Sequence, residues 1–216
     1  MNNITKVHTI YKKKDGTIVP GSTTILSILD KPALIHWAWN LGCIGQDYRK
    51  VRDQAANIGT IAHYIIECYL IKQEPDLSDY TPNNIKKANN AFQAYLEFEK
   101  RYNLKIIKSE LPLVSEKYNY GGTIDCYCML NDHFALLDFK TSSGLYPEMR
   151  CQVASYQQLL IEHRYQVDEV HLLRIDKETG EFNHYELKNL EKEWKLFKLL
   201  AKAYPLKKDI WSKISY

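Results

Sequence analysis

The feature that most constrains the fold of this chain is a run of three strand-like segments in its second half. They cover residues 105–116, 120–130 and 133–139 and are separated by short turns. The turns contain Tyr118-Asn119 and Asn131-Asp132, residue types that favour chain reversal. Because short turns join antiparallel neighbours, the pattern predicts a three-stranded meander.

Helical patterns lie on both sides of this meander in the sequence. Upstream, a hairpin at 7–20 precedes helices expected at 22–29, 33–42, 47–72 and 82–101, with Ser22 and Thr81 as candidate N-caps. Downstream, we expect a helix at 147–163, strands at 170–175 and 182–187, and a last helix at 190–204. This order predicts one α/β domain over residues 1–216, with a central mixed β-sheet flanked by helices. Residues 1–104 form its helical N-terminal part and residues 105–216 its sheet core.

The charge of the chain excludes a polybasic protein but not a nucleic-acid-binding one. Its 216 residues contain 29 Lys and Arg against 26 Asp and Glu, a net charge of +3. A basic groove fits within such a nearly neutral total. The 16 Tyr suit either a large interface or a surface on which bases stack.

The cysteines and the apolar runs indicate the compartment. Five Cys without a C-x-x-C pair argue against a disulfide framework or a structural zinc site, so we expect a reducing, cytoplasmic environment. No apolar run is long enough to cross a bilayer, and the first residues lack the apolar core of a secretory signal.

The strongest chemical signal is Asp138-Phe139-Lys140 at the end of an apolar strand. Side chains alternate along a strand, so Asp138 and Lys140 share one face. If the second and third strands pair, Asp125 lies close to Asp138, and two adjacent carboxylates favour a cation such as Mg²⁺ or Mn²⁺ between them. The lysine then suits orientation of a water molecule or stabilisation of phosphate charge. The alternative is an Asp–Lys ladder on an exposed strand.

A second signal is Gly59-Thr60-x-x-His63-x-x-x-Glu67. It places His63 and Glu67 one turn apart on one helix face, as a metal ligand and its supporting carboxylate. The alternative is a core histidine that is hydrogen-bonded to the backbone.

Further candidates are weaker in isolation. Gln152 and Tyr156 also lie one helical turn apart and suit phosphate binding, or else belong to a half-exposed helix. Glu110 is a single acid on the first strand. Aromatic residues among basic ones suit a wall for single-stranded nucleic acid, although we expect at least one of Trp37 and Trp39 to lie in the core. The members of that wall are Tyr11, Lys12, Lys13, Lys14, Trp37, Trp39, Tyr48, Arg49, Lys50 and Arg52.

In combination, these motifs resemble the RecB-type branch of the PD-(D/E)XK nuclease superfamily, including phage RecB-like exonucleases. The resemblance covers residues 21–204 and includes Gly21-Ser22-Thr23-Thr24, Lys31-Pro32 and Trp37 near the start. It implies a restriction-endonuclease-like core and hydrolysis of DNA phosphodiester bonds, by in-line attack of water with one or two divalent ions neutralising the developing charge.

The resemblance also assigns roles to residues. It implies Mg²⁺ or Mn²⁺ ligands at His63, Asp125, Asp138 and the Phe139 carbonyl. Catalytic groups would be Lys140, Asp138, Asp125 and Glu110, and DNA contacts would come from Gln152, Tyr156, Thr141 and Ser142.

Two departures from relatives refine the expectation. No Cys follows Cys151, so the iron–sulfur cluster of some relatives is not expected. No phosphate-binding G-x-x-x-x-G-K-[ST] loop is present, so a helicase or other recombination or replication protein would be a separate partner. We therefore expect an exonuclease for single-stranded DNA or DNA ends in the cytoplasm, or in the host cytoplasm if the chain is phage-encoded. The alternatives are an endonuclease or flap nuclease, a non-catalytic DNA-binding module and a nucleotide hydrolase.

Overall fold

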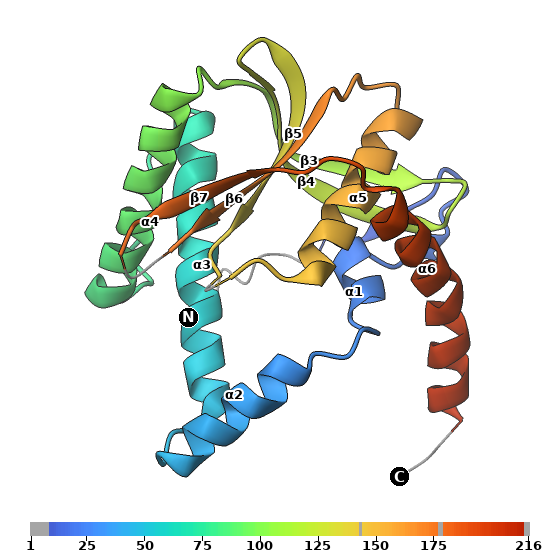
Figure 1. Ribbon diagram of the computed structural model, residues 1–216, viewed down its shortest axis with the longest axis horizontal. Coiled ribbons are helices and arrows are strands. Elements are labelled where there is room, and N and C mark those ends of the chain that lie inside the picture. The colour runs from blue at the N-terminus through green and yellow to red at the C-terminus, as the bar shows by residue number, and fades with distance from the viewer. Residues whose placement is uncertain (1–8, 143, 177–178, 214–216) are drawn as a thin grey trace.

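A five-stranded mixed sheet forms the centre of the computed structural model, which describes residues 9–142, 144–176 and 179–213 (Figure 1). The strand order is β3-β4-β5-β6-β7, and only β5 and β6 run parallel. The strands are β3 (Lys105–Ser115), β4 (Tyr120–Leu130), β5 (His133–Lys140), β6 (Glu169–Ile175) and β7 (Phe182–Glu186). The predicted α/β class, the mixed sheet and the meander are confirmed.

The connections explain this topology. Asn119, Asn131 and Asp132 have φ values of 55°, 47° and 69°, left-handed conformations that Asn and Asp tolerate in tight reversals. β3, β4 and β5 therefore pair antiparallel. The helix α5 (Pro147–Glu162) follows β5 and crosses back over the sheet, which allows β6 to run parallel to β5.

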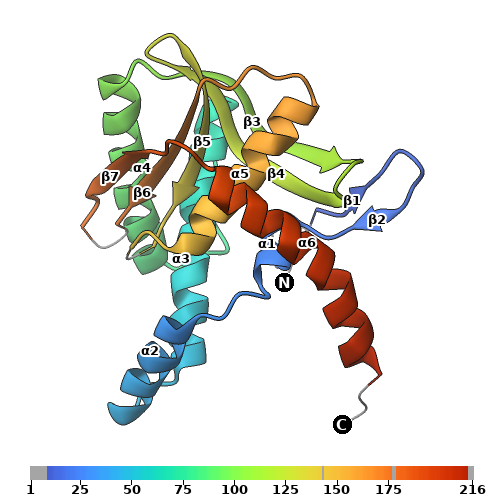
Figure 2. The same ribbon diagram turned by 45° about the vertical axis from the view of Figure 1, so that its right-hand side comes forward.

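Helices cover both faces of the sheet and create two cores (Figures 1 and 2). On one face lie α3 (Tyr48–Leu70) and α4 (Pro82–Arg101). On the other lie α1 (Ser22–Leu26), α5 and α6 (Glu191–Ser212). Neighbouring β5 residues alternate between the cores: Leu136 packs with α5 and α6, whereas Leu137 packs with α3 and α4.

The helix α2 (Pro32–Cys43) and the first half of α3 project from this body (Figure 1). None of the α2 residues, all of which the structure describes, is buried. Trp39 is 72% exposed, and Trp37 is half-buried with its ring edge-on to Tyr48. The expectation that one of the two tryptophans lies in the core is wrong, because α2 meets α3 and not the sheet.

The helix ends confirm the expected cap at Thr81, correct the one at Ser22 and add a cap at Asp47 that was not expected. Asp47 accepts a hydrogen bond from the Arg49 N–H at 2.9 Å, and Thr81 accepts one from Asn84 at 3.4 Å. Ser22 does not cap α1: it is the first residue of that helix, and its hydroxyl donates to the Gly121 carbonyl at 3.1 Å.

Three segments differ in length from the expectation by more than two residues, and the first is α1, which ends at Leu26 and not at residue 29. α6 continues past Tyr204, through Pro205, to Ser212. The first hairpin consists of β1 (Tyr11–Lys12) and β2 (Ile18–Val19), and expected positions 7 and 8 lie outside the described residues. The described cysteines form no disulfide, and Cys126 and Cys128 are buried thiols. Within the described part of the chain, no helix has the length and apolarity needed to span a membrane.

Candidate active site

Three elements bring His63, Glu110 and Asp125 together. They come from α3, β3 and β4, and one ligand atom of each lies within 4.8 Å of the other two. All three side chains are half-buried, and Glu110 and Asp125 lie in the middle of β3 and β4, beside the end of β5. An imidazole and two carboxylates at this spacing can share one divalent cation.

The backbone at Glu110 is irregular in a way that suits this convergence. Its φ of 45° lies in the left-handed region, which is costly for residues other than Gly, Asn and Asp and unusual within a strand. Glu110 lies between the register pairs Ser109–Cys126 and Leu111–Ile124, so it is opposite Asp125. Sequence patterns alone gave Glu110 no partner; the strand register supplies one.

Asp125 also connects the group to β5. Its carboxylate accepts a hydrogen bond from the Phe139 N–H at 2.9 Å. This contact holds the end of β5, and with it Asp138, beside the middle of β4, next to the last β4–β5 register pair, Cys126–Leu137. The expected proximity of the two acids follows from this pairing.

Asp138 is fully buried and forms an ion pair with Lys140, whose side chain is 16% exposed. The two side chains share a face, as predicted, and the alternative of an exposed Asp–Lys ladder is excluded. Among the described residues, no hydrogen-bond donor other than Lys140 reaches the Asp138 oxygens. A buried carboxylate that has one ammonium as its partner is costly to keep ionised. An additional cation nearby would lower that cost.

The electrostatics of this pair have opposing causes. The pKa of Asp138 is raised to about 7: burial is the largest cause, the Lys140 ammonium opposes it, and the charge of Asp125 adds to it. Burial lowers the pKa of Lys140, but the carboxylates of Asp138 and Asp125 outweigh burial and leave that pKa raised. Lys140 therefore remains an ammonium in a region with excess negative charge.

His63 reaches the group because α3 approaches β5 closely. A Cβ on Gly59 would lie 2.6 Å from the Thr141 Oγ1, so glycine lets this helix pass the end of the strand at this distance without displacing the Thr141 side chain. The His63 ring then lies edge-on to Phe139, with 6.1 Å between ring centroids. Glu67 lies half-buried one turn later on α3, outside the group that the described residues form.

Gln152 and Tyr156 support the acids from α5. The Gln152 amide donates to the Tyr156 hydroxyl at 2.7 Å, and Tyr156 is only 5% exposed. Burial and the charges of Asp138 and Asp125 raise the pKa of Tyr156 well above its usual value, so its hydroxyl stays protonated. A Cβ on Gly122 would lie 2.6 Å from the Tyr156 ring, which explains the glycine before Asp125.

Thr141 and Ser142 begin the loop after β5, and an arginine that the sequence analysis missed holds this loop. Arg174 pairs with Lys140 in the β5–β6 register and donates through Nε to the Ser142 carbonyl at 2.8 Å. It also donates to the Asn183 side chain at 2.6 Å. The signal was an arginine inside the apolar strand residues 170–175.

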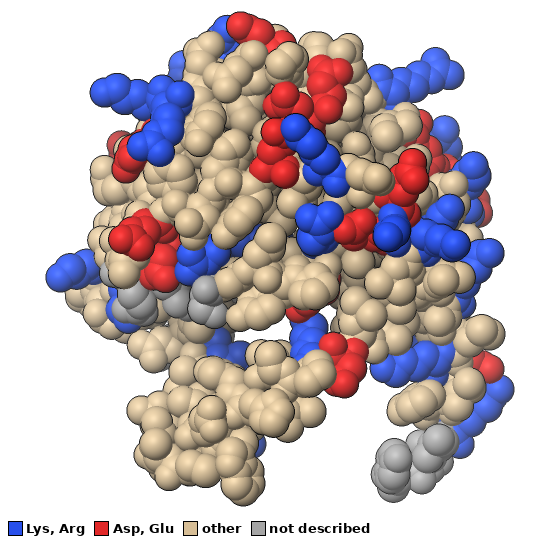
Figure 3. Space-filling view, viewed as in Figure 1, with Lys and Arg blue, Asp and Glu red and all other residues tan. Residues whose placement is uncertain are grey.

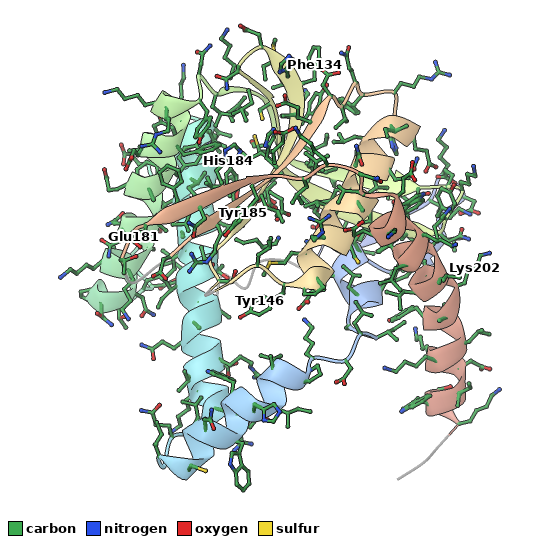
Figure 4. All side chains as sticks on the ribbon, viewed as in Figure 1. Phe134, Tyr146, Glu181, His184, Tyr185 and Lys202 are labelled. Atoms are coloured by element: carbon green, nitrogen blue, oxygen red, sulfur yellow. The ribbon has the colours of Figure 1, made fainter. Side chains whose placement is uncertain are left out.

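A cleft of about 1130 Å³ leads to His63. Its walls come from α2, the first half of α3 and the loop after β5, where Tyr146 lies (Figure 4). The space-filling view shows an opening between α2 and the body of the molecule (Figure 3). Lys31 at the start of α2 bridges to Glu148 at the start of α5, with 3.2 Å between Nζ and Oε1, and both residues line the cleft. The cleft is also lined by Trp37, Tyr48, Arg52 and Lys87, the last of which was not among the expected wall residues.

Comparison with known proteins gives structural similarity only. No protein-family model and no curated protein matches the chain. A solved structure from Eubacterium rectale named "Putative exonuclease" has a TM-score of 0.53 and 12% sequence identity, over 75% of this chain and 69% of that one. LHK-Exo, solved with dAMP, has a TM-score of 0.42 and 9% sequence identity, over 71% of this chain and 84% of that one. The fold of this chain is thus nuclease-like, a mixed sheet flanked by helices.

Proposed function

We propose that this protein is a Mg²⁺- or Mn²⁺-dependent DNA exonuclease that acts on single strands or DNA ends. The observation that carries the proposal is the convergence of His63, Glu110 and Asp125 from three elements, beside the buried Asp138–Lys140 pair. One buried acid and two half-buried acids around one ammonium, next to a cleft that His63 lines, suit metal-assisted hydrolysis of a phosphodiester. The exonuclease name of the Eubacterium rectale neighbour supports the same class of chemistry.

The residues present fit a divalent ion. His63, Glu110 and Asp125 would hold it, with Asp138 and the Phe139 carbonyl as further candidate ligands at the adjoining end of β5. A divalent ion there would supply Lewis-acid stabilisation of phosphate charge.

The side chains beside the candidate ligands would stabilise the phosphate or the attacking water and would contact the DNA backbone. Lys140 keeps its proton and would donate a hydrogen bond to a phosphate oxygen or to the attacking water. Asp138 fixes the ammonium through the ion pair, and Tyr156 stays neutral beside these charges. Thr141 and Ser142, on the loop that Arg174 holds, line the cleft and would contact the DNA backbone.

The cleft favours a single strand as substrate. Trp37 and Tyr48 offer aromatic faces and edges, and Lys31, Arg52 and Lys87 offer positive charge along the same walls. This combination is typical of surfaces that bind single-stranded nucleic acid. Because the Lys31–Glu148 bridge spans the cleft, a free end would enter more readily than the middle of a strand.

The test is cleavage of end-labelled single- and double-stranded oligonucleotides with Mg²⁺, Mn²⁺ or chelator. We expect metal-dependent product ladders, mainly from single strands. Lys140→Ala should lower the cleavage rate at least ~100-fold, because it removes one donor that stabilises phosphate charge. Glu74→Gln is the matched control, because Glu74 is an exposed acid away from the site. Full activity in chelator, or full activity of Lys140→Ala, would refute the proposal.

A covalently closed single-stranded circle distinguishes the closest alternative. An exonuclease leaves the circle intact, whereas an endonuclease with the same site cuts it. A DNA-binding module without activity would retard labelled DNA in a gel without ever shortening it.

A further inference from the structure

The last helix, α6, has two separate apolar faces. The first packs on the sheet and α5 and consists of Trp194, Phe197, Leu200, Ala201 and Tyr204. Beyond Tyr204 the helix extends away from the body (Figure 2). All residues from Pro205 to Lys213 are exposed. This half of the helix makes no contribution to the core or to the candidate active site.

The second apolar face runs along the exposed side of α6. It consists of Leu196, Leu199, Ala203, Leu206 and Ile210, and we call it the α6 stripe. The four large side chains are 40%, 58%, 65% and 53% exposed in chain order. At about 100° of rotation per residue, the stripe lies about 140° round the helix from the buried face. The α6 stripe is therefore not a continuation of the face of α6 that packs in the core.

The spacing of the α6 stripe is that of a coiled-coil seam. Its members follow one another at intervals of three, four, three and four residues, the a and d positions of a heptad. A helix that lies on a membrane presents a broad apolar face, whereas this stripe is one seam wide. The geometry fits a single partner helix.

Lysines flank the seam at the positions that select a partner. Lys195 and Lys202 occupy g positions and Lys207 an e position, and all three are exposed. Lys202 lies on the outer side of α6 (Figure 4). Asp209 is the one acid at a flanking position among the described residues of this seam. In coiled coils, residues at e and g pair with opposite charges on the partner and repel like charges.

We propose that the α6 stripe binds an amphipathic helix of another protein that carries apolar residues at its seam and Asp or Glu at its flanking positions. A parallel second copy of this chain would place Lys202 against Lys207, which disfavours self-association in that orientation. The proposal extends beyond the nuclease chemistry, and the assay below measures binding, so its failure leaves the proposed function untouched.

The test uses two designed helical peptides with leucine at every seam position. One has glutamate at all flanking positions and the other lysine, and each is labelled for fluorescence anisotropy with the full-length protein. We expect the glutamate peptide to bind about tenfold more tightly than the lysine peptide, the sum of a few favourable or unfavourable charge pairs. The triple variant Lys195→Glu, Lys202→Glu and Lys207→Glu should reverse this preference.

Two single variants control the assignment. Leu206→Asp should abolish binding of both peptides while DNA cleavage is retained, because Leu206 is 65% exposed and outside the core. Lys208→Glu, an exposed charge change off the seam, should leave peptide binding unchanged.

Three results would overturn the proposal. The first is equal affinity for the two peptides, or binding that Leu206→Asp does not reduce. The second is binding of the chain to vesicles with anionic lipid when neither peptide binds. The third is a dimer of the free protein, seen by sedimentation and lost in Leu206→Asp, which would make a second copy the occupant.

Discussion

Lys140 lies beside the carboxylate of Asp138 on the same face of β5, and it is the sole donor among the described residues that reaches this buried acid. Replacing a buried ion pair by apolar groups is often neutral or stabilising, but removing one partner is costly. The pair thus couples the stability of the sheet to the candidate active site, and this coupling can be measured.

Lys140→Met should destabilise the fold strongly at alkaline pH and little at acid pH. The pKa of Asp138 is about 7 in the folded chain against 3.8 in the unfolded one, so the folded state takes up the proton more readily. The stability contributed by this carboxyl is present below about pH 4 and is lost as pH rises to about 7. Without Lys140 the folded pKa rises further, and ionisation then leaves an unpaired buried charge. We expect a loss of about 3–5 kcal/mol at pH 9 and a much smaller loss at pH 5, measured by urea unfolding.

The double variant Asp138→Asn with Lys140→Met is the control for this prediction. It removes both charges, so it should recover most of the lost stability at pH 9 while remaining inactive on DNA. A double variant as unstable as Lys140→Met would indicate that packing, and not charge, explains the effect.

Glu110→Gly and Glu110→Ala should separate backbone strain from metal binding. Both remove one candidate ligand, so both should weaken Mn²⁺ binding in calorimetry by at least ~10-fold. Only glycine adopts the φ of 45° without cost, so Glu110→Gly should be about 1 kcal/mol more stable than Glu110→Ala. Equal Mn²⁺ affinity in both variants and the unchanged chain would exclude Glu110 from the site.

Gly59→Ala should displace α3 from the end of β5 and weaken Mn²⁺ binding at His63. The new Cβ would lie 2.6 Å from the Thr141 Oγ1, too close for the helix to keep its position. Adding Thr141→Ala removes that oxygen and should restore Mn²⁺ affinity relative to Thr141→Ala alone. Comparing the two backgrounds separates the steric effect from any direct role of Thr141. Unchanged Mn²⁺ affinity in Gly59→Ala would show that α3 accommodates the new Cβ without moving His63.

Lys31→Glu should loosen the contact across the cleft. The bridge to Glu148 is partly exposed, with Lys31 at 42%, so it stabilises closure by less than about 1 kcal/mol. We therefore expect the ratio of the binding affinity for a circular single strand to that for a linear one, measured in chelator, to rise by no more than about fivefold. Adding Glu148→Lys rebuilds the pair with its charges exchanged and should return the ratio to its starting value. A ratio that changes equally in the single and double variants would assign the effect to the side chain at position 31 and not to the bridge.

Much of the fold could be predicted because its signals are local. Turn residues such as Asn119 and Asn131 fix the meander, and alternation along β5 places Asp138 with Lys140. The cap at Thr81 marks the start of α4 through a contact within one turn of the helix. The predicted end of α6 at residue 204 was wrong. Pro205 is a local signal for a helix end, but this helix continues through it.

The sequence by itself determined the strand that carries Asp138 and Lys140 and the helix face that carries His63, since both follow from periodicity. Only the tertiary structure decided that Glu110 joins His63 and Asp125, and that Arg174 holds the loop after β5. It also decided that neither Trp37 nor Trp39 enters the core. The physical reason is that register between strands and approach between layers depend on residues far apart in the chain, which no local pattern records.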